Sequence, residues 1–396
     1  MRSDIKIVDV RAVRLTVPER APGAAPAPPP ARRPSWGGAE VANPMSRYPR
    51  LKRHRSLWYA RWGPVGCKVT AEDGTWGLGL TTHGRPVAAV IDDHFAPHLV
   101  GEPCLATERC WDLMARMARQ YGATGLAAYA LSAVDLALWD LKGKLLGQPV
   151  YALLGGPAHD DLFCYATGND TDWYVELGFE ATKLACPYGP ADGARGLDAN
   201  ERLVAQAREV LGPDRELMLD CWMAFDVEYT VRLAERLRPY RLKWIEDYLL
   251  PEDLDGFAAV RQRLPWQTLA AGEHWQLPEA FAFAANHRLV DLLQPDIQWC
   301  GGLTAAQKIV HAAEAAGLQT ILHGGSNTPY GQHLTYASPS MPWIEVSGFK
   351  TAPGVPLTEL GRLPGTPLPV NGRLRPSDAP GFGLEIEEAW LEPFFA

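Results

Sequence analysis

The sequence lacks the features that mark exported, membrane-spanning and nucleic-acid-binding proteins. Its opening residues, MRSDIKIVDVRAVRLTV, alternate like a β-strand and do not form the charged and apolar regions of a signal peptide. No apolar run reaches the roughly 18 residues of a membrane span. No long stripe of Lys and Arg occurs, and 38 basic against 46 acidic residues give a net charge of −8. We therefore expect a cytoplasmic protein that binds neither a membrane nor a nucleic acid.

Paired cysteines are also lacking. The cysteines are odd in number, scattered along the chain and free of CxxC or zinc-binding spacing. We interpret them as structural thiols in a reducing compartment. The seven residues are Cys67, Cys104, Cys110, Cys164, Cys186, Cys221 and Cys300.

The composition otherwise resembles that of an ordinary globular protein. The chain has 396 residues, of which 47% are hydrophobic and 21% are charged. At roughly 100 to 200 residues per domain, this length fits two domains, or one large α/β barrel with an appendage. The 37 glycines, 34 prolines and 14 tryptophans indicate many loops and a site with bulky walls.

The first 80 residues combine strand-like segments with a long loop. Residues 5–17 and 56–80 alternate in the manner of strands, with a turn at residues 72–74. Between them, residues 21–55 open on a Pro/Ala-rich run that cannot support a regular ladder. A loop of this length is usually disordered or a functional lid. Its start fits both equally, and a lid is favoured from Trp36 to Arg55, where aromatic and charged residues return.

The rest of the chain changes from helical segments to alternating strands and helices. Residues 85–147 are predicted to be helical, with apolar residues spaced by three and four and with Gly147 closing the pattern. From residue 161 onward, short apolar runs alternate with helical stretches, which predicts a TIM-type barrel of eight parallel strands. The strand runs are FCYATG, EATKLAC, ELMLDCW, RLKWIEDY, QTLAAGEH, VDLLQPDI, LQTILHGG and PWIEVSG.

Several of these strands finish on an ionisable residue directly after apolar ones. These residues follow one another at intervals of 23 to 27 positions, about one βα unit, so that their side chains are expected to converge above the carboxyl ends of the strands. They are Asp220, Glu246, Glu273, Asp296 and His323.

Three of these carboxylates would repel one another unless a cation lay between them. Any one of Asp220, Glu246 and Glu273, taken alone, is more simply explained as a strand-end carboxylate that caps a helix or faces solvent. Three in register instead predict a metal site. Mg²⁺ suits such a site because it takes carboxylate oxygens and keeps positions open for water or substrate.

Asp296 and His323 form a second expected unit. A carboxylate behind an imidazole fixes its tautomer and raises its basicity, as a general base requires. Glu345 ends the last strand opposite this base, where it would hydrogen-bond a developing oxyanion or a substrate hydroxyl; a charge outside the site is an equal alternative. Trp222 and Trp299 follow site strands closely enough to wall the pocket, and Trp36 lies in the predicted lid.

At these residues the chain resembles the enolase superfamily, in particular the mandelate racemase type of acid-sugar dehydratase, and most closely L-rhamnonate dehydratases. The resemblance runs from about residue 36 to the C-terminus. The segments that carry it are SAVDLALWDLKGKLLGQPVYALLGG, CYATG, LMLDCWM, LKWIE, GEH, QPDIQWCGGLT, LHGGS, VNGR and PGFG.

This resemblance implies a modified TIM barrel, (β/α)7β, closed by an α+β capping domain. The capping domain would span residues 1–155, the barrel 156–355, and a tail at 356–396 would return to the cap. The resemblance also implies one Mg²⁺ per subunit and a homo-oligomer, an octamer in the family. The implied roles are Asp220, Glu246 and Glu273 as metal ligands, His323 as base with Asp296 as its partner, Glu345 as stabiliser of the intermediate, and Arg55, Glu40, Lys183 and His274 as substrate ligands.

The implied reaction is the dehydration of a sugar acid. His323 would take the C2 proton of the Mg²⁺-bound acid, giving an enediolate. The protonated His323 would then hand a proton to the departing C3 hydroxyl on the same face, which leaves as water and gives an enol that becomes a 2-keto-3-deoxy acid.

Two alternatives stay open. An epimerase or racemase would need a second base on the opposite face, often the second lysine of a KxK strand, whereas this sequence offers only Lys183; that lysine either contacts substrate or pairs with a nearby carboxylate. A metal- and sugar-acid-binding protein without turnover is the second alternative. It is prompted by Glu40, which stands where L-rhamnonate dehydratases carry a substrate-binding histidine before Pro44-Met45-Ser46. His54 would be a substitute for that histidine or a solvent-facing residue.

Overall fold

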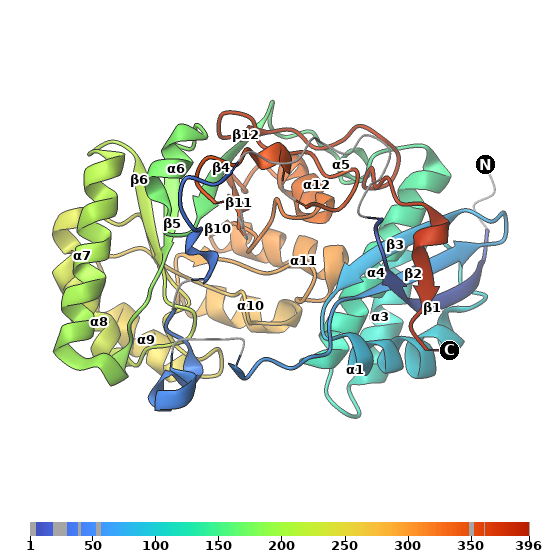
Figure 1. Cartoon of the computed structure of the whole chain (residues 1–396). Coiled ribbons are helices and arrows are strands. Elements are labelled where there is room, and N and C mark those ends of the chain that lie inside the picture. Colours follow the sequence, from blue (N-terminus) through green and yellow to red (C-terminus); the bar gives the residue numbers. More distant parts are fainter. Residues whose placement is uncertain are drawn as a thin grey trace.

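The protein folds into two lobes (Figure 1). The computed structural model describes residues 5–18, 30–38, 41–52, 57–347, 352–359 and 361–395. The larger lobe is a curled parallel sheet surrounded by helices, and the smaller is an antiparallel sheet covered by helices. Within the described part of the chain, no helix combines the length and the apolar character needed to cross a membrane.

The smaller lobe, or cap, is built on a four-stranded antiparallel sheet in the order β13-β1-β2-β3. The predicted strand segment 56–80 contains two strands, which the expected turn at residues 72–74 connects. Residues 391–393 pair with β1, so the end of the chain returns to its first strand. The strands are β1 (Ile7–Leu15), β2 (Val65–Ala71), β3 (Trp76–Thr81) and β13 (Leu391–Pro393).

Helices of the predicted region 85–147 cover this sheet. The longest, α4 (Leu126–Leu146), is buried almost all round because it lies between β3 and the barrel helix α11 (Gly302–Ala315). Gly77 and Gly79 allow the close approach, since a Cβ atom at either position would collide with the backbone of α4. The other elements are α1 (Gly84–Ala89), the π-helix η5 (Val90–Phe95), α2 (Ala96–Leu99), α3 (Thr107–Ala118) and α5 (Val150–Leu153).

A buried carboxylate ties α4 to its surroundings. Asp140 has no solvent exposure. Its two oxygens accept hydrogen bonds from the backbone N–H groups of Leu78 and Phe382, both at 3.0 Å, and from Lys144 at 2.7 Å. One side chain therefore satisfies buried donors from β3 and from the C-terminal segment.

Replacing Asp140 with alanine is expected to lower the free energy of unfolding by about 3 kcal/mol, because two buried N–H groups lose their acceptor. Urea unfolding monitored by circular dichroism measures this change. Asp112→Ala is the matched control: Asp112 pairs with Arg116 on the surface, so a change within about 0.5 kcal/mol is expected. Equal stabilities of the two variants would contradict the anchoring role of Asp140.

The larger lobe contains the predicted parallel strands. Their order is β10-β9-β8-β7-β6-β5-β4-β11, and the short strand β12 (Arg373–Leu374) adds to β4 in antiparallel fashion. The backbone N–H of Ser326, after β10, donates to the carbonyl of Glu345 in β11 at 2.9 Å and so joins the two edges. The strands are β4 (Leu162–Thr167), β5 (Ala181–Ala185), β6 (Glu216–Asp220), β7 (Ile245–Glu246), β8 (Leu269–Ala271), β9 (Leu292–Leu293), β10 (Gln319–Thr320) and β11 (Trp343–Val346).

Helices alternate with these strands and surround the sheet (Figure 1). Each of the eight predicted runs contains one of the strands, and the predicted fold class, a modified (β/α)7β barrel with an α+β cap, is confirmed. The helices are α6 (Thr171–Glu176), α7 (Gly193–Leu211), α8 (Val227–Leu237), α9 (Leu254–Arg263), α10 (Leu277–Asn286), α11 and α12 (Pro329–Ala337).

The inner face of the curled sheet is apolar farther from the carboxyl ends of its strands and polar at those ends. Met218 and Trp244 belong to a buried cluster inside the sheet. Asp220 and Glu246 stand two positions later on the same strands, and alternation of side chains therefore puts them on the same inner face, one level higher. This stacking brings the predicted site residues to the carboxyl ends of the strands.

Two described pieces of the long loop predicted at residues 21–55 lie on the barrel. In the first, Arg33 forms ion pairs with Asp170 (3.1 Å) and Asp172 (2.6 Å) near the start of α6. In the second, the backbone N–H of Ala42 donates to the carbonyl of Cys186, directly after β5, at 2.9 Å. Short 3₁₀ helices occupy residues 36–38, 44–47 and 49–51. The segment before β2 therefore runs along the edge of the barrel that carries the site residues.

Candidate active site

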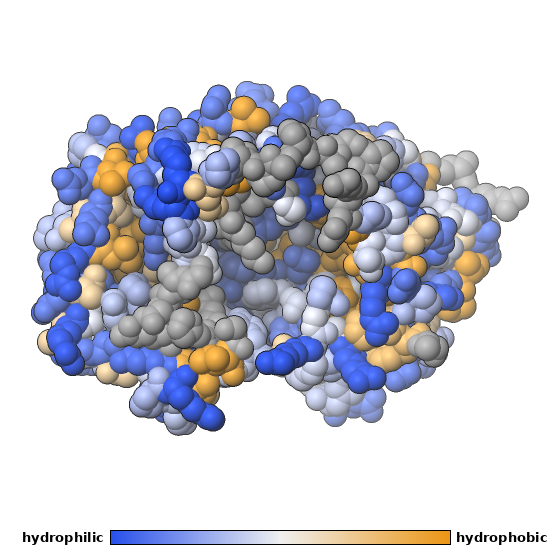
Figure 2. Space-filling model, viewed as in Figure 1, coloured by the Kyte–Doolittle hydropathy of each residue, from blue (hydrophilic) through white to orange (hydrophobic). Residues whose placement is uncertain are grey.

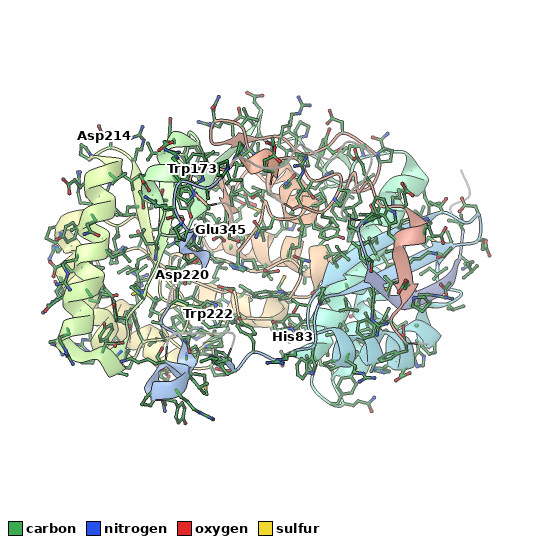
Figure 3. The ribbon with its side chains drawn as sticks, in the orientation of Figure 1. His83, Trp173, Asp214, Asp220, Trp222 and Glu345 are labelled. Carbon is green, nitrogen blue, oxygen red and sulfur yellow. The ribbon has the colours of Figure 1, made fainter. Side chains whose placement is uncertain are left out.

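The candidate site lies where the carboxyl ends of the barrel strands face the cap. Asp220 and Glu246 end neighbouring strands and are direct partners in the parallel register. Figure 3 shows Asp220, Trp222 and Glu345 on the barrel side and His83 toward the cap. The space-filling view shows a hollow on this face between the two lobes (Figure 2). The spacing of these residues in the sequence therefore brings them to one edge of the barrel.

Glu246 is buried in a dense polar network. One carboxylate oxygen, Oε1, contacts the ammonium group of Lys183. The other, Oε2, accepts hydrogen bonds from the indole N–H of Trp244 at 2.6 Å and from the side-chain amide of Gln294 at 2.8 Å. Both oxygens are thus held in place, by residues of two other strand segments and by Trp244 of the same segment.

Lys183 carries a fully buried positive charge at the centre of this network. Its Nζ atom contacts Glu246 and lies 2.8 Å from Oε1 of Glu345. Burial disfavours the ammonium form, but the two carboxylates outweigh it and hold the pKa of Lys183 well above its usual range. Of the two interpretations that the sequence left open, the structure shows pairing with carboxylates.

Glu345 is likewise fully buried and fully hydrogen-bonded. Besides Lys183, the hydroxyl of Thr167 donates to Oε1, and the backbone N–H of Gly324 donates to Oε2 at 2.6 Å. Burial works against its ionisation, yet Lys183, His323 and these donors lower the pKa of Glu345 to about 2. Glu345 is therefore an ionised carboxylate that accepts hydrogen bonds and has no proton to give.

His323 and Asp296 form the predicted dyad. Nδ1 of His323 lies 2.8 Å from Oδ2 of Asp296, while the backbone N–H of Gln298 donates to Oδ1 of Asp296 at 2.7 Å. Nε2 of His323 lies 3.4 Å from Oε1 of Glu273. Burial alone would lower the pKa of His323, but Glu273 and the hydrogen bond to Asp296 raise it to about 10. A cation that neutralised Glu273 would bring this pKa down toward the range of a useful base.

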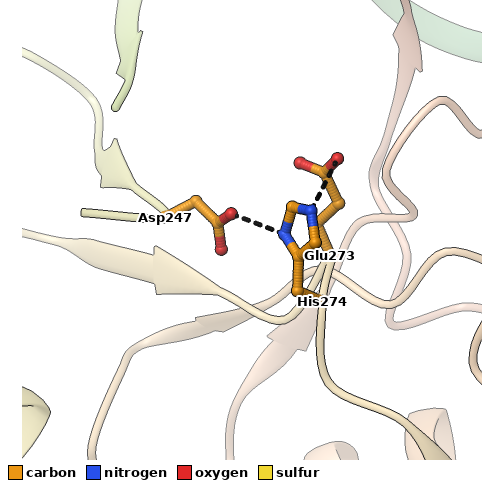
Figure 4. Close-up of side chains that lie close together, drawn as sticks. All are labelled: Asp247, Glu273 and His274. Carbon is orange, nitrogen blue, oxygen red and sulfur yellow. Dashed lines mark hydrogen bonds and ion pairs between the residues drawn. The ribbon is translucent and has the colours of Figure 1, made fainter. Parts of the chain in front are cut away.

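A second imidazole–carboxylate pair, His274 and Asp247, lies beside Glu273 (Figure 4). Nδ1 of His274 lies 2.9 Å from Oδ2 of Asp247, and Nε2 of His274 lies 3.8 Å from Oε1 of Glu273. Burial opposes protonation of His274, but Glu273 and Asp247 raise its pKa to about 9. Glu273 is thus flanked by two histidines, each backed by its own aspartate.

Aromatic rings line this arrangement. The ring of Trp299 lies 5.2 Å from that of His323 and 5.9 Å from that of His274. Trp222 lies 5.9 Å from His274. In the segment before β2, the stacked rings of Trp58 and Tyr59 lie 6.1 and 6.2 Å from Trp222. His274 therefore lies between two tryptophans of the barrel, and His323 packs against one of them, Trp299. The rings of Trp58 and Tyr59 extend this aromatic lining.

Family models match both lobes of the chain. Residues 63–155 match the mandelate racemase / muconate lactonizing enzyme N-terminal domain, and residues 170–390 match the enolase C-terminal domain-like family. The chain belongs to the enolase superfamily. The family predicted from the sequence motifs is confirmed.

Named relatives of this enolase-superfamily chain include dehydratases. An L-rhamnonate dehydratase of Saccharopolyspora erythraea is 42% identical over 312 residues, 78% of this chain and 80% of that protein. The crystal structure of rhamnonate dehydratase from Gibberella zeae complexed with Mg has a TM-score of 0.88 at 30% identity and covers 100% of this chain and 98% of that one. These relatives confirm the prediction of an enzyme of the hydro-lyase class.

The same fold also carries an isomerase. The crystal structure of the 3,6-anhydro-D-galactonate cycloisomerase from Zobellia galactanivorans has a TM-score of 0.72 at 30% identity and covers 83% of this chain and 94% of that one. Membership of the superfamily therefore leaves the reaction to be argued from the site itself.

Some residues of the site were not predicted from the sequence, and other residues, which the sequence did indicate, lie outside the described part of the chain. Arg55, Glu40 and His54 belong to the latter group. Asp247 was missed although it directly follows Glu246 at a strand end, which is a usable signal. Gln294 and Thr167 were missed because uncharged polar residues near strand ends are common and carry no such signal.

Proposed function

We propose that the chain is an Mg²⁺-dependent dehydratase of L-rhamnonate or a closely related sugar acid. The reaction removes the C2 proton, expels the C3 hydroxyl and yields a 2-keto-3-deoxy acid. The observation that carries the proposal is the His323–Asp296 dyad, in which the half-buried His323 is paired through Nδ1 with the buried Asp296 and its Nε2 lies 3.4 Å from Oε1 of Glu273. A base beside a carboxylate cluster is the arrangement that proton abstraction next to a metal-bound carboxylate requires.

Asp220, Glu246 and Glu273 would hold one Mg²⁺ ion. Oε2 of Glu273 is buried and has no hydrogen-bond partner among the described residues, which leaves a lone pair for a cation. Another group, Asp247, Glu273 and His274, also places its ligand atoms within 4.8 Å of one another. That group includes an imidazole, which suits transition metals, whereas the all-oxygen set suits Mg²⁺. A bound Mg²⁺ ion would withdraw charge from the substrate carboxylate and acidify the C2 proton.

His323 acts as the base and then as the acid. Its Nδ1–H donates to Asp296, so that the lone pair for proton abstraction resides on Nε2. Once protonated, Nε2 is the proton donor for the C3 hydroxyl on the same face of the substrate. One imidazole therefore serves both steps of a syn elimination.

For Glu345 we propose a role other than the contact with an oxyanion or a substrate hydroxyl that the sequence predicts. Because its oxygens already accept from Thr167, Lys183 and Gly324, we propose that it positions the backbone directly after His323 and holds Lys183 in place. Arg55, Glu40 and His274 are retained as proposed substrate ligands.

Epimerisation is the second candidate, and the His274–Asp247 pair favours it. Removal of a C2 proton from one face and return to the other requires two bases, and the Nε2 atoms of His323 and His274 lie 3.4 and 3.8 Å from the same oxygen, Oε1 of Glu273. Lys183 is a poor candidate for the second base because it is fully buried between two carboxylates.

Incubation with L-rhamnonate and a panel of sugar acids in D₂O separates these functions. With Mg²⁺, we expect a 2-keto-3-deoxy product, detected as its semicarbazone, and with EDTA we expect no product and no C2 exchange. Recovery of C2-inverted, deuterated acid alone would establish epimerisation and exclude dehydration. Binding by calorimetry without any C2 exchange would instead identify a non-catalytic binder.

A further inference from the structure

His83 and Tyr129 bring polar groups of the cap to the candidate site. His83 lies two residues after the end of β3 and adopts a left-handed backbone conformation, with φ of 64°. Tyr129 lies in the first turn of α4. Their rings meet edge to face at 4.6 Å, and the ring of Trp62 lies 5.7 Å from His83 on its other side. The two residues thus form one rigid pair in the cap.

This pair reaches the catalytic histidine through a single tryptophan. The ring of Tyr129 lies 5.8 Å from that of Trp299, and Trp299 lies 5.2 Å from His323. Burial raises the pKa of the Tyr129 hydroxyl, and the carboxylates of Asp296 and Glu273 raise it further. The charges of the site therefore act on the hydroxyl of Tyr129, and only the ring of Trp299 stands between Tyr129 and His323.

Both polar groups retain hydrogen-bonding capacity. Tyr129 is half-buried, and its hydroxyl makes no hydrogen bond within the described part of the chain. Nδ1 of His83 is hydrogen-bonded to the hydroxyl of Thr82 at 3.0 Å, which leaves Nε2 of His83 for a hydrogen bond to a ligand. Burial lowers the pKa of His83, so the ring is neutral at pH 7. A neutral imidazole and a phenol suit hydroxyl groups better than they suit a carboxylate.

We propose that His83 and Tyr129 bind the hydroxyl groups at the end of the sugar-acid chain remote from its carboxylate. This inference rests on the proposed function, which places the carboxylate at Asp220, Glu246 and Glu273 and places C2 at His323. The remaining carbons then extend past Trp299 toward the cap. The pair determines specificity by favouring six-carbon polyhydroxy acids over short ones, and it takes no part in proton transfer.

The backbone at His83 supports a positioning purpose. A non-glycine residue with positive φ is uncommon, although histidine tolerates this region better than most residues. The left-handed turn ends β3, and the next residue, Gly84, packs too tightly against the carbonyl of Trp62 to accept a Cβ atom. The imidazole is therefore directed by a constrained backbone.

The test compares L-rhamnonate with the four-carbon acid of the same configuration at C2 and C3. Tyr129→Phe removes only the hydroxyl, and His83→Asn removes the ring while tolerating positive φ. Each is expected to lower kcat/KM for L-rhamnonate about tenfold, mainly through KM, and to leave kcat/KM for the four-carbon acid unchanged. Tyr121→Phe is the matched control, because Tyr121 is an exposed cap tyrosine bonded to His94, and it should change neither value.

Equal losses on both acids would overturn the proposal, as would no loss on L-rhamnonate. Calorimetric titration of L-rhamnonate into the Mg²⁺-loaded variants decides the question independently of turnover. If the wild-type enzyme forms no product, the proposed function fails. The proposed role of His83 and Tyr129 is then tested by binding alone. It is supported if Tyr129→Phe weakens L-rhamnonate binding about tenfold while binding of the four-carbon acid is unchanged, and it is overturned by any other result.

Discussion

Asparagine in place of His323 is expected to lower kcat for dehydration on the order of 10³- to 10⁴-fold, because one side chain supplies both the base and the acid. Asparagine keeps a hydrogen-bonding group beside Asp296 but cannot take up the C2 proton. Steady-state formation of the 2-keto-3-deoxy acid and exchange of the C2 proton in D₂O measure the loss. Mg²⁺ affinity, measured by calorimetry, should change little.

His311→Asn is the matched control, because His311 is exposed on α11 and its loss should leave kcat unchanged. His274→Asn separates dehydration from epimerisation: a dehydratase should keep C2 exchange in this variant, whereas a two-base epimerase should lose C2 inversion. Full activity of the His323 variant would refute the role assigned to the dyad.

Methionine in place of Lys183 is expected to have the largest effect on stability. Without the ammonium group, Glu246 and Glu345 would be buried without a countercharge, and such a loss typically costs about 3–5 kcal/mol. A cation bound to Glu246 should recover much of this cost, since it restores the missing charge. We therefore expect Mg²⁺ to stabilise Lys183→Met more than it stabilises the wild type.

Thermal unfolding with and without Mg²⁺ tests this expectation. Lys308→Met is the control, because Lys308 pairs with Glu108 on the surface and should contribute less than about 1 kcal/mol. If Mg²⁺ raises the Tm of the Lys183 variant no more than that of the wild type, Lys183 is a packing residue and does not compensate the charges of the metal site.

Much of the barrel was predictable because its signals are local. Asp220 ends β6 directly after three apolar residues, and the same pattern recurs at Glu246 one βα unit later. Regular spacing then implies regular height on the barrel, so the convergence of these residues followed from the sequence. The cap strands were predictable from alternation, including the turn after β2.

Other features depended on contacts between distant segments. The sequence offered two interpretations of Lys183, and only the neighbouring strands β7 and β11 show that its partners are Glu246 and Glu345. The role that we propose for Glu345 differs from the predicted one for the same reason, because its three donors come from β4, β5 and the turn after β10.

By itself, the sequence determined the fold class, the family and the residues at the carboxyl ends of the strands, since each of these rests on local periodicity and motif spacing. Only the tertiary structure decided which charges neutralise one another and which cap residue lies against Trp299. In the sequence, nothing distinguishes Tyr129 from the other residues of a buried helix. It contacts Trp299 only because α4 packs between the cap sheet and the barrel. Long-range packing, which no local pattern records, brings these groups together.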